Sequence, residues 1–215
     1  DMCIRDSSRT MLYNINSREW DNDLLELFNI PKKILPQVKE SSHEFGQHKD
    51  TKIKITGIIG DQQAALFGQQ CFRTNSMKAT FGTGCFLMAN TGSEPKYSNQ
   101  GLLTTIGYGV SNTTAYALEG SIFSCGTIVK WMRDGLSFFK DASETETLIN
   151  ENWNSNGVLF IPALSGLGVP HWNPTIKGSF YGLTADNTKE DLITAAFKSI
   201  AYQLKDCLLY TSPSP

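Results

Sequence analysis

Residues 57–69 read GIIGDQQAALFGQ and place one carboxylate where an apolar, strand-like run gives way to a helix of small residues. Asp61 follows Gly60 and precedes two amides, Gln62 and Gln63. One interpretation is that Asp61 caps the helix, so that its carboxylate accepts bonds from the N–H groups of the first turn. The other is that Asp61 faces a ligand, because open α/β sheets bind ligands at the carboxyl ends of their strands.

The composition indicates a globular chain without a strong charge. The chain has 215 residues, of which 40% are hydrophobic, and its net charge is −2. That hydrophobic content suffices for a buried core. The charge balance shows no excess of basic residues of the kind that binds nucleic acid or an anionic membrane. The longest apolar runs are far shorter than the roughly 20 residues of a membrane span. We therefore expect no nucleic-acid partner and no membrane span.

The cysteines favour a reduced, cytoplasmic protein over a disulfide scaffold. Their number is odd, no two have the CxxC spacing, and the three histidines are too scattered to suggest a metal site. The five cysteines are Cys3, Cys71, Cys85, Cys125 and Cys207.

Hydrophobic patterns predict a mixed α/β layer fold. A helix capped by Asp21 and stopped by Pro31 precedes a polar loop over 39–51. The strand 53–59 ends just before Asp61, and the helix after it starts there. An antiparallel meander is expected from four strand-like runs, at 76–81, 85–89, 102–108 and 114–118. Further helices are expected over 121–136, 144–153 and 187–206, and further strands over 158–162 and 180–183.

Two more glycine positions could carry chemistry. The turn Gly82-Thr83-Gly84 joins two apolar strands, and its backbone N–H groups and the Thr83 hydroxyl could hold a phosphate. Alternatively, the turn is a hairpin that simply needs glycine. Gly126, at the entry to a helix, could serve only close helix packing.

Four long stretches together resemble the FGGY carbohydrate kinase family, and within it the members that phosphorylate glycerol. They read GIIGDQQAALFGQ, FGTGCFLMANTG, YALEGSIFSCGTIVKWMRDGL and IPALSGLGVPHWNPTIKGSFYGLT. The resemblance runs in order over about residues 8–206. It implies two ribonuclease-H-like domains of the hexokinase and actin-like ATPase class, present here in part, which close on a cleft.

The resemblance also divides the chain. Residues 1–70 would complete the first domain and residues 71–206 would begin the second. We set aside 1–7 and 207–215 as cloning or sequencing scars. The chain would then be an internal segment of a longer protein and inactive on its own.

The resemblance assigns the substrate side of the site to three residues. Asp61 matches the catalytic base that accepts the proton of the attacking glycerol hydroxyl. Gln62 and Phe86 match positions that contact glycerol, the first through its amide and the second through its ring. Asp61 is also the one candidate metal contact in this chain.

Three further positions match residues on the nucleotide-binding side of the site. Thr83 matches a residue that hydrogen-bonds the nucleotide phosphates, and Gly126 a residue that contacts the nucleotide. Lys130 stands where well-known members have a nucleotide-contacting glutamine. An ammonium group donates hydrogen bonds but accepts none, so Lys130 is either an altered contact or a solvated helix lysine.

These matches imply a reaction between glycerol and ATP with Mg²⁺, in a protein that forms a homo-oligomer when complete. Two rivals stay open. One is another FGGY kinase acting on a pentulose, gluconate or related polyol, and the other is a non-catalytic relative with a kinase fold.

Overall fold

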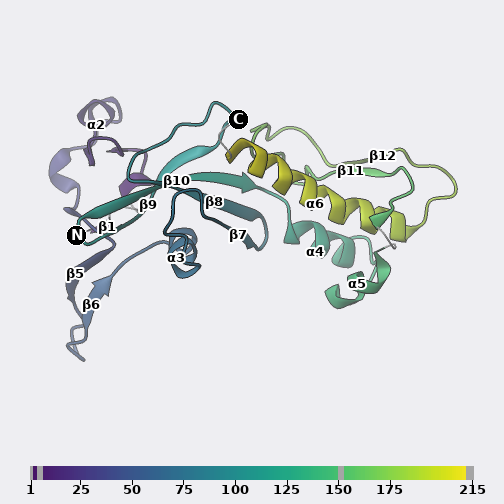
Figure 1. Cartoon of the computed structure of the whole chain (residues 1–215), viewed down its shortest axis with the longest axis horizontal. Helices are drawn as coiled ribbons and strands as arrows, with labels where there is room; N and C mark the ends of the chain where they lie inside the picture. Colours follow the sequence, from purple (N-terminus) through teal and green to yellow (C-terminus); the bar gives the residue numbers. More distant parts are fainter. Residues whose placement is uncertain (1, 4–6, 150–152, 212–215) are drawn as a thin grey trace. The chain divides into compact units, whose positions relative to one another are not determined.

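The computed structural model describes residues 2–3, 7–149 and 153–211, and its contacts divide the chain into two compact units. Unit 1 comprises residues 1–78, 88–98 and 103–119; unit 2 comprises 79–87, 99–102 and 120–215. Figure 1 labels their helices and strands. Within the described residues, no helix combines the length and the apolar character that crossing a membrane requires.

Unit 1 begins with short elements around a capped helix. Asp21 caps α2 (Asn22–Leu27) as predicted, because its side chain accepts from the N–H groups of Asp23 and Leu24. Only Leu25 of this helix is buried, whereas Leu27 is exposed, so unit 1 covers little of the helix's apolar surface. The neighbouring short elements are β1 (Met2–Cys3), β2 (Tyr13–Asn14), β3 (Glu19–Trp20), η1 (Lys32–Ile34) and β4 (Val38–Lys39).

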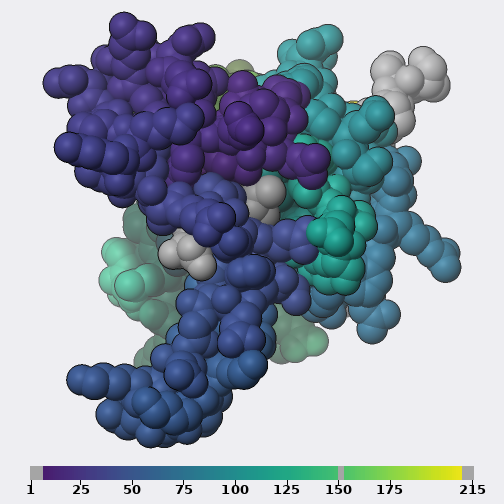
Figure 2. Space-filling model, turned by 90° about the vertical axis from the view of Figure 1, so that its left-hand side faces the viewer, coloured from purple at the N-terminus to yellow at the C-terminus, as the bar shows by residue number. Residues whose placement is uncertain are grey.

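A hairpin spans residues 42–57, where a polar loop over 39–51 and a strand over 53–59 were predicted. Strand β5 (Ser42–Gln47) pairs antiparallel with β6 (Lys54–Gly57), and Figures 1 and 2 show this hairpin extending as an arm of unit 1. Nearly all of its residues are exposed. The prediction of a loop was wrong because β5 lacks the alternation that burial of one face imposes on a strand.

The four predicted strands exist, but they do not form a meander. They are β7 (Met77–Phe81), β8 (Cys85–Gly92), β9 (Leu103–Val110) and β10 (Thr113–Ile122), and the sheet has the order β7-β8-β10-β9. The connection over 93–102 leads from β8 to β9, which lies at the edge of the sheet, and β10 then pairs between β8 and β9. Sequence spacing could not reveal this crossover, since the connection has the composition of an ordinary loop.

A tight turn sets the register of β9 and β10. The two connecting residues, Ser111 and Asn112, both have positive φ values, of 52° and 61°. Two-residue turns of this kind match the twist of paired strands. The pairing places Thr113 opposite Val110, and a shift between Ala115 and Tyr116 marks a bulge.

In unit 2, helices pack against a two-stranded ribbon, as Figure 1 shows. The elements are α4 (Gly126–Asp134), η2 (Ala142–Glu144), α5 (Thr145–Leu148), β11 (Leu159–Ile161), β12 (Ser179–Tyr181) and α6 (Lys189–Thr211). The core joins α4, β11 and α6 through buried residues such as Ile128, Phe160 and Ile193, and the Trp131 ring stacks on Phe160. Burial of this apolar surface stabilises the unit.

Two predicted helices of unit 2 are shorter than expected. Strand β10 continues to Ile122, so α4 begins at Gly126 and not at Ser121. Helix α5 ends at Leu148, because Ile149 is extended; residues 150–152 of the predicted helix lie outside the described residues.

The cysteines whose side chains are described are buried free thiols, as predicted. They are Cys71, Cys85, Cys125 and Cys207. Cys207, which the sequence analysis set aside with the terminal segment, is fully buried in α6, and its Sγ would lie 3.2 Å from a Cβ built on Gly120. The Cys207 position is therefore part of the folded unit; of the segments set aside, residues 1, 4–6 and 212–215 lie outside the described residues.

Candidate functional site

Asp61 is the first residue of α3 (Asp61–Gly68) in unit 1, and its side chain does not cap the helix. The N-cap position belongs to Gly60, which makes no side-chain bond, so the capping interpretation of Asp61 was wrong. Asp61 is exposed, and its Oδ2 accepts a bond from Gln62 Nε2 at 3.3 Å. The Asp61 carboxylate, in the first turn of α3, interacts favourably with the helix dipole although it makes no capping bond. Its free oxygen can therefore serve a ligand.

Gln62 connects Asp61 to a lysine that the sequence analysis missed. Lys78 on β7 donates from Nζ to Gln62 Oε1 at 2.5 Å, and Lys78 is buried, with 6% of its surface exposed. The next residue, Gln63, is fully buried, and its amide atoms have no hydrogen-bond partner among the described residues. No local signal marked Lys78, because a lysine in a strand is ordinarily a surface residue.

In unit 2, the Gly82-Thr83-Gly84 turn is bonded to the start of α4. The Gly82 carbonyl accepts from the Gly126 N–H at 2.9 Å. The Thr83 carbonyl accepts from the N–H groups of Cys125 and Thr127, at 3.0 and 3.1 Å, and from Thr127 Oγ1 at 3.0 Å. The first amides of α4 are thus already satisfied by protein carbonyls, so this helix start is not itself an anion site.

This contact explains both glycines at the junction. A Cβ on Gly126 would lie 2.5 Å from the Gly82 carbonyl oxygen, and a Cβ on Gly84 would overlap the Ile122 carbonyl oxygen. Close packing of two backbones therefore requires glycine at each position. The nucleotide role of Gly126 stays a prediction beside this packing role.

Three donors of the turn remain for a phosphate. Thr83 is exposed, and its hydroxyl and the N–H groups of Thr83 and Gly84 donate to no acceptor among the described residues. Exposed N–H groups on a glycine turn, next to a hydroxyl, suit a phosphate oxygen. A nucleotide contact at this turn stays a prediction.

The Cys125 thiol, next to this turn, is not a nucleophile candidate. Burial raises the pKa of Cys125, and a hydrogen bond with the Gly126 backbone opposes the shift only in part. The thiol therefore stays protonated near neutral pH.

The other two predicted residues both lie in unit 2. Phe86 is half-buried on β8 in unit 2, and Lys130 is exposed on α4. Lys130 takes part in no ion pair among the described residues, which agrees with a solvated lysine. The structure thus pairs Asp61 with Gln62 in unit 1, and Thr83 with the start of α4 in unit 2.

No protein-only metal centre is built into the described part of the chain. Histidine, cysteine, aspartate and glutamate side chains form no group of three or more that could hold a metal ion there. A Mg²⁺ ion bound beside Asp61 would have to take most of its ligands from phosphates and water, as Mg²⁺ commonly does.

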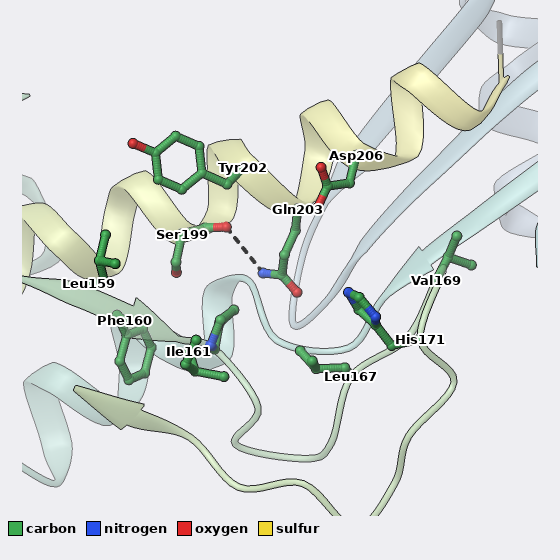
Figure 3. A pocket seen from close by; sticks show the side chains of 11 residues that line it. Leu159, Phe160, Ile161, Leu167, Val169, His171, Ser199, Tyr202, Gln203 and Asp206 are labelled. Carbon is green, nitrogen blue, oxygen red and sulfur yellow. Dashed lines mark hydrogen bonds between the residues drawn. The ribbon is translucent and has the colours of Figure 1, made fainter. Parts of the chain in front are cut away.

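Unit 2 also holds a pocket of about 270 Å³, drawn in Figure 3, that contains none of the predicted site residues. It lies between α6, which contributes Ser199, Gln203 and Asp206, and the chain from β11 to His171. Gln203 is held to its own helix by a bond from Nε2 to the Ser199 carbonyl at 3.5 Å. The lining is mainly apolar and carries no arrangement for phosphoryl transfer.

Family models match most of the chain. The N-terminal domain of the FGGY family of carbohydrate kinases matches residues 4–68, and the C-terminal domain matches residues 77–210. The chain belongs to the FGGY family of carbohydrate kinases. As an FGGY chain it is of mixed α/β class, with part of each domain present.

Among curated relatives, this FGGY chain is 48% identical over 207 residues to a glycerol kinase of Pediococcus pentosaceus, a match that covers 94% of this chain and 41% of the relative. It is 49% identical to a glycerol kinase of Burkholderia vietnamiensis, covering 95% of this chain and 42% of that relative. The chain thus spans about two-fifths of the length of these relatives.

Among solved structures, the chain resembles Plasmodium falciparum glycerol kinase with ADP, at a TM-score of 0.89 and 37% identity over 97% of this chain and 43% of that one. It also resembles a ligand-bound xylulose kinase from Lactobacillus acidophilus, at a TM-score of 0.83 and 21% identity over 96% of this chain and 44% of that one. The second likeness shows the fold alone.

Proposed function

We propose that this chain is part of an ATP-dependent glycerol kinase that makes sn-glycerol 3-phosphate and ADP. The observation that carries the proposal is Asp61, an exposed carboxylate at the start of α3, in a chain 48% identical to a curated glycerol kinase. Among solved structures, the identity is 37% to a glycerol kinase and 17–22% to xylulose kinases, which favours glycerol over a pentulose.

In the proposed reaction, a glycerol hydroxyl oxygen bonds to the terminal phosphorus of ATP while the bond from that phosphorus to ADP breaks. Asp61 accepts the hydroxyl proton, which contributes about 10²–10⁴-fold in enzymes of this kind. Gln62 and Phe86 hold the glycerol, and Thr83 donates to the phosphates. Asp61 would be the carboxylate beside Mg²⁺, which would supply neutralisation of phosphate charge when bound with ATP.

The finer expectations belong to the same proposal. They are nucleotide contacts by Gly126 and Lys130, domains over 1–70 and 71–206, a homo-oligomer when complete, and a cytoplasmic location. The remaining catalytic groups would come from segments that flank this chain in the longer protein.

The test uses a grafted kinase, in which residues 8–206 of this chain replace the matching segment of the Pediococcus pentosaceus glycerol kinase. Phosphorylation of glycerol, xylulose, ribulose and gluconate is compared, with circular dichroism confirming that the graft is folded. A preference for glycerol supports the proposal. A preference for a sugar substrate favours another FGGY kinase, and a folded graft without activity on any of them favours the non-catalytic relative.

A further inference from the structure

The buried lysine of β7 has an unusual partner. Lys78 is 6% exposed, and its Nζ donates to Gln62 Oε1 at 2.5 Å. Removing an ammonium group from water is costly unless polar atoms of the protein compensate for the lost hydration. The contact with Gln62 is therefore a built interaction, not a loose surface pair.

The chemistry of the two groups fixes how the Gln62 amide lies. An ammonium group has three donors and no acceptor, whereas an amide has an oxygen that accepts and an NH₂ that donates. The amide oxygen must therefore face Lys78, and the NH₂ must face away. That NH₂ donates to Asp61 Oδ2 at 3.3 Å.

The reversed amide would be unfavourable at both ends. Its NH₂ would face the ammonium group, donor against donor, and its oxygen would face the Asp61 carboxylate, acceptor against acceptor. Lys78 thus selects one of two amide orientations, and that orientation holds Asp61 Oδ2. Asp61 Oδ1 accepts no bond from the described residues.

We propose that Lys78 is a positioning residue of the kinase site. It orients Gln62 so that the amide NH₂ holds Asp61 Oδ2 and leaves Oδ1 to receive the proton of the substrate hydroxyl. This inference rests on the proposed function for the identity of the proton, but the orientation of Gln62 can be tested without any activity.

The first experiment detects the orientation of the Gln62 amide by NMR. The chain is labelled with ¹⁵N in glutamine side chains, and Gln62→Glu identifies the Gln62 NH₂ signals. We expect these signals to shift on Asp61→Asn in the otherwise unaltered chain, because the NH₂ group donates to Asp61 Oδ2, and to lose that response in Lys78→Met. Lys78→Arg, which also only donates, should retain it. Lys54→Met is the matched control, because Lys54 also lies in a strand but its side chain is 63% exposed.

Lys78→Gln guards against a Lys78→Met chain that does not fold. A glutamine can either donate or accept, so it fills the space without selecting the amide orientation, and the Asp61 response should weaken. A response unchanged in a folded Lys78→Met or Lys78→Gln chain overturns the inference.

The second experiment measures the grafted kinase. Without the oriented Gln62 amide, the Asp61 carboxylate is free to rotate away from the substrate hydroxyl, so Lys78→Met should lower kcat and leave substrate binding unchanged. We expect kcat to fall about tenfold, or about 1.4 kcal/mol of barrier, with the KM for ATP unchanged and Lys78→Arg close to the parent. An active parent graft whose Lys78→Met variant keeps the parent's kcat overturns the positioning role, whereas an inactive parent graft with the NMR response intact counts against the proposed function only.

Discussion

Replacing Gly126 with alanine tests the contact between the Gly82-Thr83-Gly84 turn and α4. The new Cβ would lie 2.5 Å from the Gly82 oxygen, so this carbonyl must retreat by about 0.9 Å to reach the 3.4 Å at which ordinary contact begins. That movement takes the 2.9 Å bond between Gly126 N and Gly82 O beyond hydrogen-bond range.

Two effects of this substitution oppose each other. Overpacking costs about 1–3 kcal/mol and the lost bond about 1 kcal/mol. Against this, alanine is favoured over glycine in a helix by about 1 kcal/mol at most. Steric overlap therefore wins, and we expect the free energy of unfolding to fall by about 1–3 kcal/mol.

Urea unfolding followed by tryptophan fluorescence measures the change, since Trp131 lies in the core that α4 helps to form. Hydrogen exchange at the Thr127 amide, which should become faster, gives the local signal. The matched control is Gly68→Ala at the end of α3, where a Cβ meets nothing within 4 Å and stability should stay or rise slightly. A Gly126→Ala chain that unfolds at the parent's urea concentration would refute the steric argument.

Two further predictions concern unit 1. Arg9 bonds both carboxylate oxygens of Glu119 at 3.2 Å, and the Glu119 side chain is 3% exposed. Arg9→Met leaves the buried Glu119 carboxylate without its partner, so it should lower the free energy of unfolding by about 2 kcal/mol more than Glu119→Gln does. Equal urea midpoints for the two variants would contradict this. Burial raises the pKa of Tyr13 to about 12, against about 10 when unfolded. The stabilisation that neutral Tyr13 gives is complete below pH 10 and is lost as the pH rises through 12. Tyr13→Phe should therefore flatten the fall of unfolding free energy between pH 10 and pH 12, and parallel plots of unfolding free energy against pH for the two chains would contradict this.

Local chemistry made part of the fold predictable. The cap by Asp21 and the helix after Gly60 follow from interactions within one turn, which the sequence displays directly. The order of the sheet depends on which distant strands meet, and β10 enters between β8 and β9 without a sequence signal. The exposed strand β5 likewise lacks the hydrophobic pattern on which strand prediction rests.

The site shows the same division. The turn at Thr83 and the carboxylate at Asp61 were recognisable because glycine and acidic residues interrupt apolar runs. The bonds from the start of α4 to the Thr83 carbonyl join residues 42 and 44 positions apart, and the bond from Lys78 to Gln62 spans 16. Pairings at such separations arise only once the strands and helices are in place.

Turnover by the Asp61→Asn form of the grafted kinase is the most direct test of the account. Asparagine keeps the size of the side chain but cannot take the proton, so we expect kcat to fall by at least about 10²-fold while ADP affinity changes little. Asp23→Asn, at an exposed acid in the first turn of α2, should leave kcat unchanged. Parent-level turnover in Asp61→Asn would contradict the assignment of Asp61 as the base.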